Sequence, residues 1–367
     1  MSKICIVSPS LQLGGIERSL SILANQFVKM GHEVHFIKIF PFEDFYQLDN
    51  RIKVYTPPFN FSKKGESAVK NILYYVRVLS PVGGYIKNLI GTIKPDTVLS
   101  YGDWFPHLIM LGLKNKFPFY YSNRSNPRIK YTKSIEFIRN LAYKLTPPTG
   151  VIAQTSQAKD RKVKLLGNRT KIKIVPNPAP NFNELNCEKE NWIISVGRLH
   201  KEKGFIRLME AFSKIKDRSD WKLVLVGDGI HAKEIMGMSE VYGIQDSVVF
   251  LGKVLDVQSV LCKSKIFAFG SHHEGFPNAL LEGACAGLAC VSFDIVAGPR
   301  DIISNGENGF LIEDGNLDEM IRILQYLINN ESEIKRLGEA AKKSSDRFNA
   351  DRITNEILNF ILQNTNS

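Results

Sequence analysis

Two glutamates separated by seven residues, Glu274 and Glu282, are the clearest candidates for chemistry in this chain of 367 residues. Gly275 would allow a ligand to approach the backbone closely, and Pro277 suits a first helical position, where its missing N–H costs nothing. The next amides would then point outward from the positive end of a helix, which favours an anionic ligand. The segment expected to contact that ligand consists of Gly275, Phe276, Pro277, Asn278, Ala279 and Leu280.

Two cations precede the glutamate pair in a basic turn. Arg198 and Lys203 belong to the sequence Gly-Arg-Leu-His-Lys-Glu-Lys-Gly, which follows an apolar run over 192–197. If that run is a strand, both side chains can converge on one phosphate-sized group at its carboxyl end. The simpler interpretations are a basic surface loop and a strand-to-helix loop with two solvated glutamates. Both cations and both carboxylates together favour a site for an anionic substrate.

These two motifs resemble the retaining glycosyltransferases of family 4. The family carries a Glu-x7-Glu signature with a Glu-Gly-Phe-Pro opening, matched from Glu274, and a Gly-Arg-Leu-x-x-x-Lys-Gly element, matched from residue 197. The resemblance implies that Arg198 and Lys203 hold the diphosphate of a nucleotide-sugar donor. It also implies that Glu274 contacts the transferred sugar and that Glu282 binds the ribose hydroxyls.

Further positions follow from the same resemblance, which covers nearly all of residues 170–315 and is looser before them. Gly252 and Lys253 are expected to line the nucleotide base, with residues 227–229 near the same pocket. Gly14 and Gly15 look like the glycine loop that closes over donor phosphates and acceptor. A Ser-x-Arg-Asn segment, typical of members that build bacterial surface glycans, is matched at Arg124 but interrupted by a serine.

The sequence lacks the Asp-x-Asp motif with which other glycosyltransferases hold Mn²⁺ or Mg²⁺ on a donor diphosphate. His272 and His273 have no third ligand at a recognisable spacing, so we expect wall residues and no metal. No other cofactor is implied. Fixed cations and helix amides would instead neutralise the leaving diphosphate.

Short apolar runs alternate with helical patterns in both halves of the chain, which predicts an α/β protein. Two Rossmann-like domains facing each other across a cleft, a GT-B-like fold, are expected. We assign residues 1–180 to an acceptor-binding domain, 181–190 to a linker and 191–345 to a nucleotide-sugar-binding domain. A C-terminal helix within 346–367 would return to the first domain, as the resemblance implies.

Charge is divided unevenly along the chain. Residues 1–185 contain 27 Lys and Arg against 11 Asp and Glu, a net charge of +16, whereas residues 186–367 contain 21 against 26, a net charge of −5. A basic half indicates an anionic membrane surface or a nucleic acid. The absence of an aromatic-rich basic recognition motif disfavours nucleic acid. Residues 128–145 mix basic and apolar residues at mostly helical spacing, which fits either a helix in the membrane interface or a core helix.

Neither a signal peptide nor a membrane-spanning helix is predicted. Residues 3–8 are too short an apolar run for a signal, and Arg77 and Lys87 interrupt the apolar stretch over 71–91. The five cysteines are scattered, which predicts reduced thiols. The expected location is the cytoplasm, peripheral on the inner face of the membrane.

The sequence thus predicts a retaining, metal-independent glycosyltransferase that moves a sugar from a nucleotide diphosphate, UDP being favoured, to a glycan or polyprenyl-diphosphate-linked acceptor. An epimerase of similar two-domain form would instead convert the free donor. A nucleic-acid-binding protein would leave both motifs unexplained. A catalytically silent homologue is disfavoured because Glu274, Glu282, Arg198 and Lys203 are all present.

Overall fold

The computed structural model of the protein describes residues 1–12, 14–59, 68–102, 113, 116–124, 133–167, 170–180, 182, 187–218 and 220–363. The chain forms two compact units, Met1–Pro178 together with Ala350–Ser367, and Ala179–Asn349. The division after Pro178 lies just before the boundary expected at residue 180. The C-terminal segment that returns to the first unit begins at Ala350 rather than at 346.

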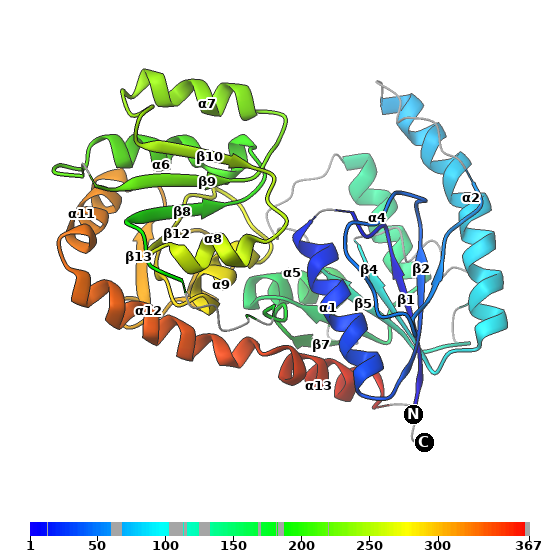
Figure 1. Ribbon diagram of the computed structural model, residues 1–367. Coiled ribbons are helices and arrows are strands. Elements are labelled where there is room, and N and C mark those ends of the chain that lie inside the picture. Colours follow the sequence, from blue (N-terminus) through cyan, green and yellow to red (C-terminus); the bar gives the residue numbers. More distant parts are fainter. Residues whose placement is uncertain are drawn as a thin grey trace. The chain divides into compact units, whose positions relative to one another are not determined.

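The first unit is built on a parallel sheet of seven strands in the order β3-β2-β1-β4-β5-β6-β7 (Figure 1). Chain order reverses between β1 and β4, as in doubly wound folds, where ligands bind at the carboxyl ends of the strands. The strands are β1 (Lys3–Ser8), β2 (Glu33–Lys38), β3 (Lys53–Tyr55), β4 (Thr97–Tyr101), β5 (Phe119–Asn123), β6 (Gly150–Ala153) and β7 (Lys171–Ile174). The helices are α1 (Gly15–Lys29), α2 (Ala68–Ile93), α4 (Lys133–Leu145), α5 (Ser156–Leu166) and α13 (Ala350–Ile361).

The core of the first unit lies on both faces of this sheet, because successive strand residues point to opposite faces. Ile4 and Ile6 of β1 belong to a cluster with residues of α1 and α13, whereas Cys5 and Val7 belong to a second cluster with residues of α2. The final helix therefore packs on the first unit. Four of its apolar side chains are buried: Ile353, Ile357, Leu358 and Ile361.

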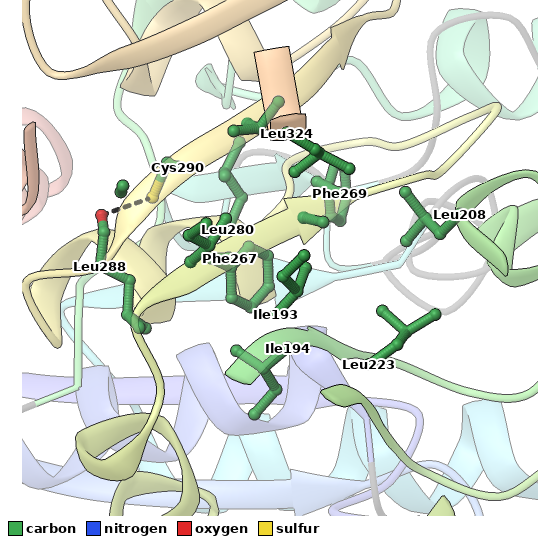
Figure 2. Packing of buried hydrophobic residues seen from close by; sticks show 14 of the residues in the cluster. Ile193, Ile194, Leu208, Leu223, Phe267, Phe269, Leu280, Leu288, Cys290 and Leu324 are labelled. Carbon is green, nitrogen blue, oxygen red and sulfur yellow. Dashed lines mark hydrogen bonds between the residues drawn. The ribbon is translucent and has the colours of Figure 1, made fainter. Parts of the chain in front are cut away.

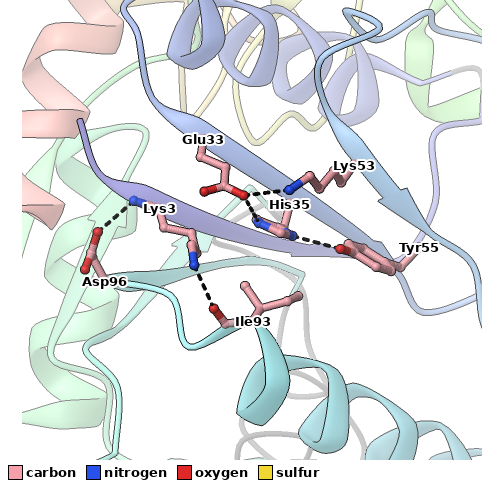
Figure 3. A network of polar contacts seen from close by, with 7 residues as sticks. All are labelled: Lys3, Glu33, His35, Lys53, Tyr55, Ile93 and Asp96. Carbon is pink, nitrogen blue, oxygen red and sulfur yellow. Dashed lines mark hydrogen bonds and ion pairs between the residues drawn. The ribbon is translucent and has the colours of Figure 1, made fainter.

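Two separate sets of polar contacts lie in the first unit (Figure 3): Lys3 of β1 contacts Asp96 and the Ile93 carbonyl at the end of α2, and four side chains of β2 and β3 contact one another. His35 of β2 contacts the Tyr55 hydroxyl of β3 at 2.9 Å and Glu33 Oε1 at 3.0 Å, and Lys53 donates to the same oxygen at 2.8 Å. These two donors lower the pKa of Glu33, Lys53 having the larger effect. Burial lowers the pKa of His35, so this imidazole is neutral at neutral pH and the contacts are structural.

The second unit contains a parallel sheet of six strands in the order β10-β9-β8-β11-β12-β13. Its strands are β8 (Trp192–Val196), β9 (Lys222–Val226), β10 (Val248–Gly252), β11 (Ile266–Phe269), β12 (Ala289–Asp294) and β13 (Gly309–Glu313). Its helices are η1 (Lys201–Lys203), α6 (Phe205–Ser213), α7 (Ala232–Val241), α8 (Val257–Lys263), α9 (Asn278–Cys285), α10 (Pro299–Ile302), α11 (Leu317–Ile328), α12 (Glu331–Ser345) and η2 (Asp346–Phe348). The GT-B-like prediction of two Rossmann-like sheets is confirmed.

Apolar side chains of the strands and their covering helices fill the interior of the second unit (Figure 2). Phe267 of β11 and Leu280 of α9 are both fully buried in this cluster. The first turns of α9 are therefore held against β11, the strand that precedes the glutamate loop. The core fixes the two ends of that loop.

One sequence prediction in this unit is wrong. A disulfide joins Cys187 to Cys262, with a Cα–Cα distance of 5.9 Å, so these cysteines are not reduced thiols in the structure. Sequence spacing gave no sign of the pair, because a disulfide depends on proximity in the fold. The other three cysteines are buried and free, and burial raises the pKa of Cys285 to about 11. The five cysteines together therefore give no support to a reducing compartment.

Within the described ranges, none of the helices combines the length and the apolar composition that crossing a membrane requires. The long helix α2, which contains Arg77, Pro81 and Lys87, is the one that covers the apolar stretch over 71–91.

Candidate functional site

The predicted cations and the first glutamate follow the two strands at the reversal point of the second sheet. Strands β8 and β11 are paired neighbours, with Ile193 opposite Ile266, and chain order runs outward from them in both directions. Arg198 and Lys203 follow β8, and Glu274 follows β11. The carboxyl ends of strands at such a point are the usual ligand site of a doubly wound sheet.

Lys203 and Glu274 form an ion pair across this point. Lys203 Nζ lies 2.5 Å from Glu274 Oε1, and the Ser271 hydroxyl donates to the same oxygen at 2.8 Å. Their side chains are 24% and 12% exposed, which leaves both within reach of a ligand. In the sequence, only the family resemblance connected these two residues. The structure shows that their side chains are in contact.

Both partners keep hydrogen-bonding capacity for a ligand. A lysine ammonium has three N–H donors and a carboxylate has two acceptor oxygens. Lys203 uses one donor on Glu274, and Glu274 Oε2 has no partner among the residues that the structure describes. Lys203 can therefore donate to phosphate oxygens while Glu274 accepts from a hydroxyl, without breaking the pair.

Arg198 is the second cation of the site, and its side chain is exposed. Across the described part of the chain, its guanidinium has neither an ion pair nor a hydrogen bond. The backbone of the turn is fixed nevertheless, because the Leu199 N–H donates to the Asp228 carbonyl at 2.9 Å. An anchored backbone with an unpaired guanidinium suits the binding of a mobile anion.

Arg207 of α6 holds the loop that carries Glu274, a role that the sequence analysis missed. Its guanidinium donates to the carbonyl oxygens of Gly270 and Ser271 and, at 2.8 Å, to Asp314. Burial lowers the pKa of Arg207, and the nearby carboxylate opposes that shift. The guanidinium still stays protonated, because arginine titrates so far above neutral pH. Arg207 is therefore a positioning residue for Glu274.

A close backbone approach completes this attachment. Gly204 has φ of +64°, and a Cβ there would lie 1.7 Å from the Gly270 carbonyl oxygen. The His272 N–H also donates to the Glu202 carbonyl at 2.8 Å. The turn bearing Lys203 and the loop bearing Glu274 are thus joined by backbone contacts that a larger residue at 204 would disrupt.

The N-terminus of α9 differs from the prediction by one residue. Pro277 is the residue before the helix, with φ of −83° and ψ of 76°, so Asn278 is the first helical residue. The Asn278 N–H donates to the Phe276 carbonyl at 3.0 Å and is not available to a ligand. Among the described residues, the N–H groups of Ala279 and Leu280 have no acceptor, so two amides point from the positive helix end.

The second glutamate lies within α9 and is nearly inaccessible. Glu282 is 5% exposed, whereas the side chain of Glu274 is 12% exposed. Phe276, between them, is buried against Phe348 with ring centroids 5.9 Å apart. This small exposed fraction suits a binding role for Glu282 better than a reacting one.

The glycines after β9 have packing roles that account for them without a ligand. A Cβ on Gly227 would lie 1.9 Å from the Gly197 carbonyl oxygen, and one on Gly229 would lie 2.4 Å from that of Leu199. Gly252, at the end of β10, has φ of +62° and open space beside it. Gly252 therefore leaves space for a ligand beside it, whereas residues 227–229 support the Arg198 turn.

Gly14 and Gly15 lie in the first unit. Gly14 immediately precedes α1 in extended conformation, and Gly15 is the first residue of that helix. They therefore occupy the position of a glycine loop at the carboxyl end of β1, beside the reversal point of the first sheet. Arg198, Lys203 and Glu274 belong to the second unit.

His272 and His273 are exposed beside Glu274. Burial lowers the pKa of His272, and the charge of Arg207 lowers it further, so this imidazole is neutral at neutral pH. Over the part of the chain that the structure describes, no three His, Cys, Asp or Glu side chains group together as ligands for a metal ion. The charge at the site comes from Arg198, Lys203 and Glu274.

The part of the chain that contains this site is similar to known proteins. Residues 179–344 match the profile of the family described as glycosyl transferases group 1. A Campylobacter jejuni relative, "GalNAc-alpha-(1->4)-GalNAc-alpha-(1->3)-diNAcBac-PP-undecaprenol alpha-1,4-N-acetyl-D-galactosaminyltransferase", is 27% identical, with all of both chains covered.

Two solved structures share the fold of the whole chain. The lipopolysaccharide outer core galactosyltransferase WaaB in its apo form is 21% identical, with 98% of this chain and 99% of that chain covered and a TM-score of 0.75. HepE of Anabaena in complex with UDP is 17% identical, with 98% and 100% covered and a TM-score of 0.77. Residues 179–344 are thus similar to glycosyl transferases group 1, and the whole chain has a GT-B fold, with bacterial glycan glycosyltransferases among the proteins that it resembles.

Proposed function

We propose that the protein is a retaining glycosyltransferase of family 4 that uses a nucleotide-diphosphate sugar as donor, with UDP as the favoured nucleotide. The sugar would be transferred to a glycan or a polyprenyl-diphosphate-linked acceptor in the synthesis of a surface polysaccharide. The observation that carries this proposal is the Lys203–Glu274 pair at 2.5 Å, with Arg198 unpaired in the same turn. A relative named for an undecaprenol-diphosphate acceptor and a similar structure that holds UDP support the choice of substrates.

The arrangement suits the charges that develop in such a transfer. Breaking the bond to the donor leaves positive charge on the sugar ring and negative charge on the diphosphate, so both must be stabilised. Arg198, the unused donors of Lys203 and the amides of Ala279 and Leu280 would stabilise the diphosphate. Glu274 Oε2 would accept from a sugar hydroxyl near the reacting carbon, and the leaving phosphate would help deprotonate the incoming hydroxyl on the same face.

Dependence on an acceptor separates this function from that of an epimerase. A transferase consumes donor in proportion to added acceptor, whereas an epimerase equilibrates free donor without one. We expect UDP release to rise when polyprenyl-diphosphate-linked oligosaccharide is added to enzyme and UDP-sugar. An epimerised sugar nucleotide formed at full rate without acceptor would contradict the proposal.

Transfer should proceed without a divalent ion. Arg198, Lys203 and the amides of α9 provide fixed positive charge for the diphosphate, and the sequence has no Asp-x-Asp. We therefore expect EDTA to change the initial rate by less than about twofold, roughly 0.4 kcal/mol in the barrier. Loss of the rate on chelation, with recovery on added Mn²⁺ or Mg²⁺, would show that a metal neutralises the diphosphate.

The first unit offers a surface for the membrane on which a lipid-linked acceptor resides. On α4, Phe137, Leu141 and Leu145 are 69%, 43% and 43% exposed, at i, i+4 and i+8 and therefore on one face. Lys144 beside them is exposed, whereas Arg139 of the same helix is buried and does not serve the surface, contrary to the sequence prediction. Residues 128–132, the start of the predicted helix, lie outside the described residues.

This surface should bind anionic bilayers reversibly. Each basic residue near an anionic leaflet contributes about 1 kcal/mol, and the exposed apolar stripe adds burial in the interface. We expect flotation with anionic but not neutral liposomes, weakened by high salt, and a clear loss in the double variant Phe137→Ser, Leu141→Ser. Ile230→Ser, which removes an apolar side chain that is 85% exposed in the other unit, is the matched control. Equal binding to both lipids, or to neither, would contradict peripheral membrane attachment.

A further inference from the structure

A buried arginine gathers the carboxyl ends of four neighbouring strands in the first unit. Arg124 follows β5 directly, and its Nε donates to the Ser122 hydroxyl at 2.7 Å. One terminal nitrogen donates to Tyr101 of β4 at 3.3 Å and the other to Asn177 Oδ1, beyond β7. Gln154, beyond β6, donates to the same Asn177 oxygen at 2.8 Å. The cluster thus lies at the ligand-binding edge of the sheet.

The charge of Arg124 has no compensating carboxylate among the residues that the structure describes. All three hydrogen-bond acceptors are neutral, and the remaining contact is the Tyr101 ring, 5.2 Å from the guanidinium carbon. Arg124 is only 5% exposed, and burying an unpaired charge costs several kcal/mol. The uncompensated charge therefore calls for a negative partner.

Two other buried cations of this unit have a carboxylate partner, whereas Lys162, 2% exposed, donates to the Tyr143 hydroxyl at 2.8 Å. Lys38 is 5% exposed and lies 2.9 Å from Asp44, and Arg139 is 5% exposed and lies 3.5 Å from Glu136. If Arg124 only held the strand ends together, a neutral donor would serve without the cost of a buried charge. The comparison with Lys38 and Arg139 favours a negative partner for Arg124 that comes from outside the chain.

The unused donors of Arg124 define what that partner can be. A guanidinium has five N–H groups, and three are used, one on each nitrogen. One N–H remains on each terminal nitrogen, the number that a bidentate contact with a carboxylate or phosphate requires. Gln154 Oε1, buried and without a partner among the described residues, could accept from a hydroxyl of the same ligand.

We propose that Arg124 binds an anionic oxygen group of the acceptor, a phosphate or a carboxylate, at the carboxyl edge of the first sheet. The identification of this ligand as the acceptor rests on the proposed function, whereas the anion-binding site itself does not depend on that function. The uninterrupted Ser-x-Arg-Asn pattern is not required, because the guanidinium is held by Ser122, Tyr101 and Asn177.

Thermal melts of the full chain saturated with UDP test the site, since UDP then occupies the donor phosphate position. Inorganic phosphate, inorganic pyrophosphate and glucuronate are added separately, so that phosphate and carboxylate ligands are distinguished. We expect at least one of them to raise the Tm of the wild type. Arg124→Gln should raise the apparent Kd for that anion by about tenfold or more. Arg124→Lys keeps the positive charge but loses the bidentate guanidinium, so its apparent Kd for the anion should lie between those of the wild type and Arg124→Gln.

Arg51→Gln is the matched control, because it removes the same charge from an exposed arginine of the first unit. It should bind the anion as the wild type does, which separates a defined site from general attraction to the basic half. The proposal would be overturned if none of the anions raised the Tm of the wild type. It would also be overturned if the Arg124 and Arg51 variants bound the anion equally well. The same melts also measure how far UDP alone raises the Tm of the wild type. The absence of a donor site would remove the effect of UDP, whereas the absence of the anion site would remove only the effect of the added anion.

Discussion

Replacing Glu274 by alanine is expected to lower the rate of sugar transfer by at least about 100-fold, a loss of about 2.7 kcal/mol of transition-state stabilisation. The change removes the acceptor oxygen facing the sugar and also frees Lys203 and Ser271 from the contacts of 2.5 and 2.8 Å that orient them. UDP affinity should be largely kept, because the diphosphate contacts come from cations and amides. Initial rates and UDP titrations of the purified variant provide the measurement.

Two further variants serve as a comparison and a control for Glu274→Ala. Glu274→Gln keeps the shape and can still accept from Ser271, so it isolates the loss of charge. Glu319→Ala removes an exposed carboxylate that pairs with Arg322 on α11, away from the site, and should leave the rate unchanged. Near wild-type transfer by a folded Glu274→Ala protein would remove Glu274 from the mechanism.

Arg198→Ala is expected to lower transfer by a similar factor, at least about 100-fold, and in addition to weaken UDP binding by about tenfold or more. An exposed guanidinium without a protein partner has no structural contact to lose, so the fold should be unaffected. Isothermal titration with UDP, together with initial rates, separates this outcome from that of Glu274→Ala.

The control for Arg198 is Arg322→Ala, which deletes an exposed arginine of the same unit. If both variants bind UDP as the wild type does, Arg198 is a surface residue and the diphosphate is held elsewhere. A loss of UDP affinity confined to Arg198→Ala would assign the diphosphate to the β8 turn.

Much of the fold was predictable because local patterns and tertiary structure agree. The apolar residues of α1 recur at helical spacing, and Gly31, with φ of +84°, follows the end of the helix, so the local sequence alone indicates this element. Two strands that were not predicted are β3 (Lys53–Tyr55), a short exposed edge strand, and β13 (Gly309–Glu313), which begins at a glycine. Neither has the length or alternation from which a strand can be recognised.

Only those residues of the candidate site that belong to a sequence motif could be predicted. Arg198, Lys203 and Glu274 belong to short patterns, and the pairing of β8 with β11 brings those patterns together. The contacts of Arg207 with the Gly270 and Ser271 carbonyls depend on side-chain reach across the fold, and no sequence pattern encodes them. The disulfide was missed for the same reason.

The most direct test of the central claim is the anomeric configuration of the sugar released from a nucleotide donor. The wild-type protein is incubated with a panel of UDP- and GDP-α-linked sugars without acceptor, and slow hydrolysis is followed by proton NMR at times before mutarotation. A retaining transferase releases the α-anomer first, from at least one UDP-sugar. Initial release of the β-anomer would contradict retention, and the absence of UDP binding and of hydrolysis across the whole panel would contradict the glycosyltransferase proposal itself.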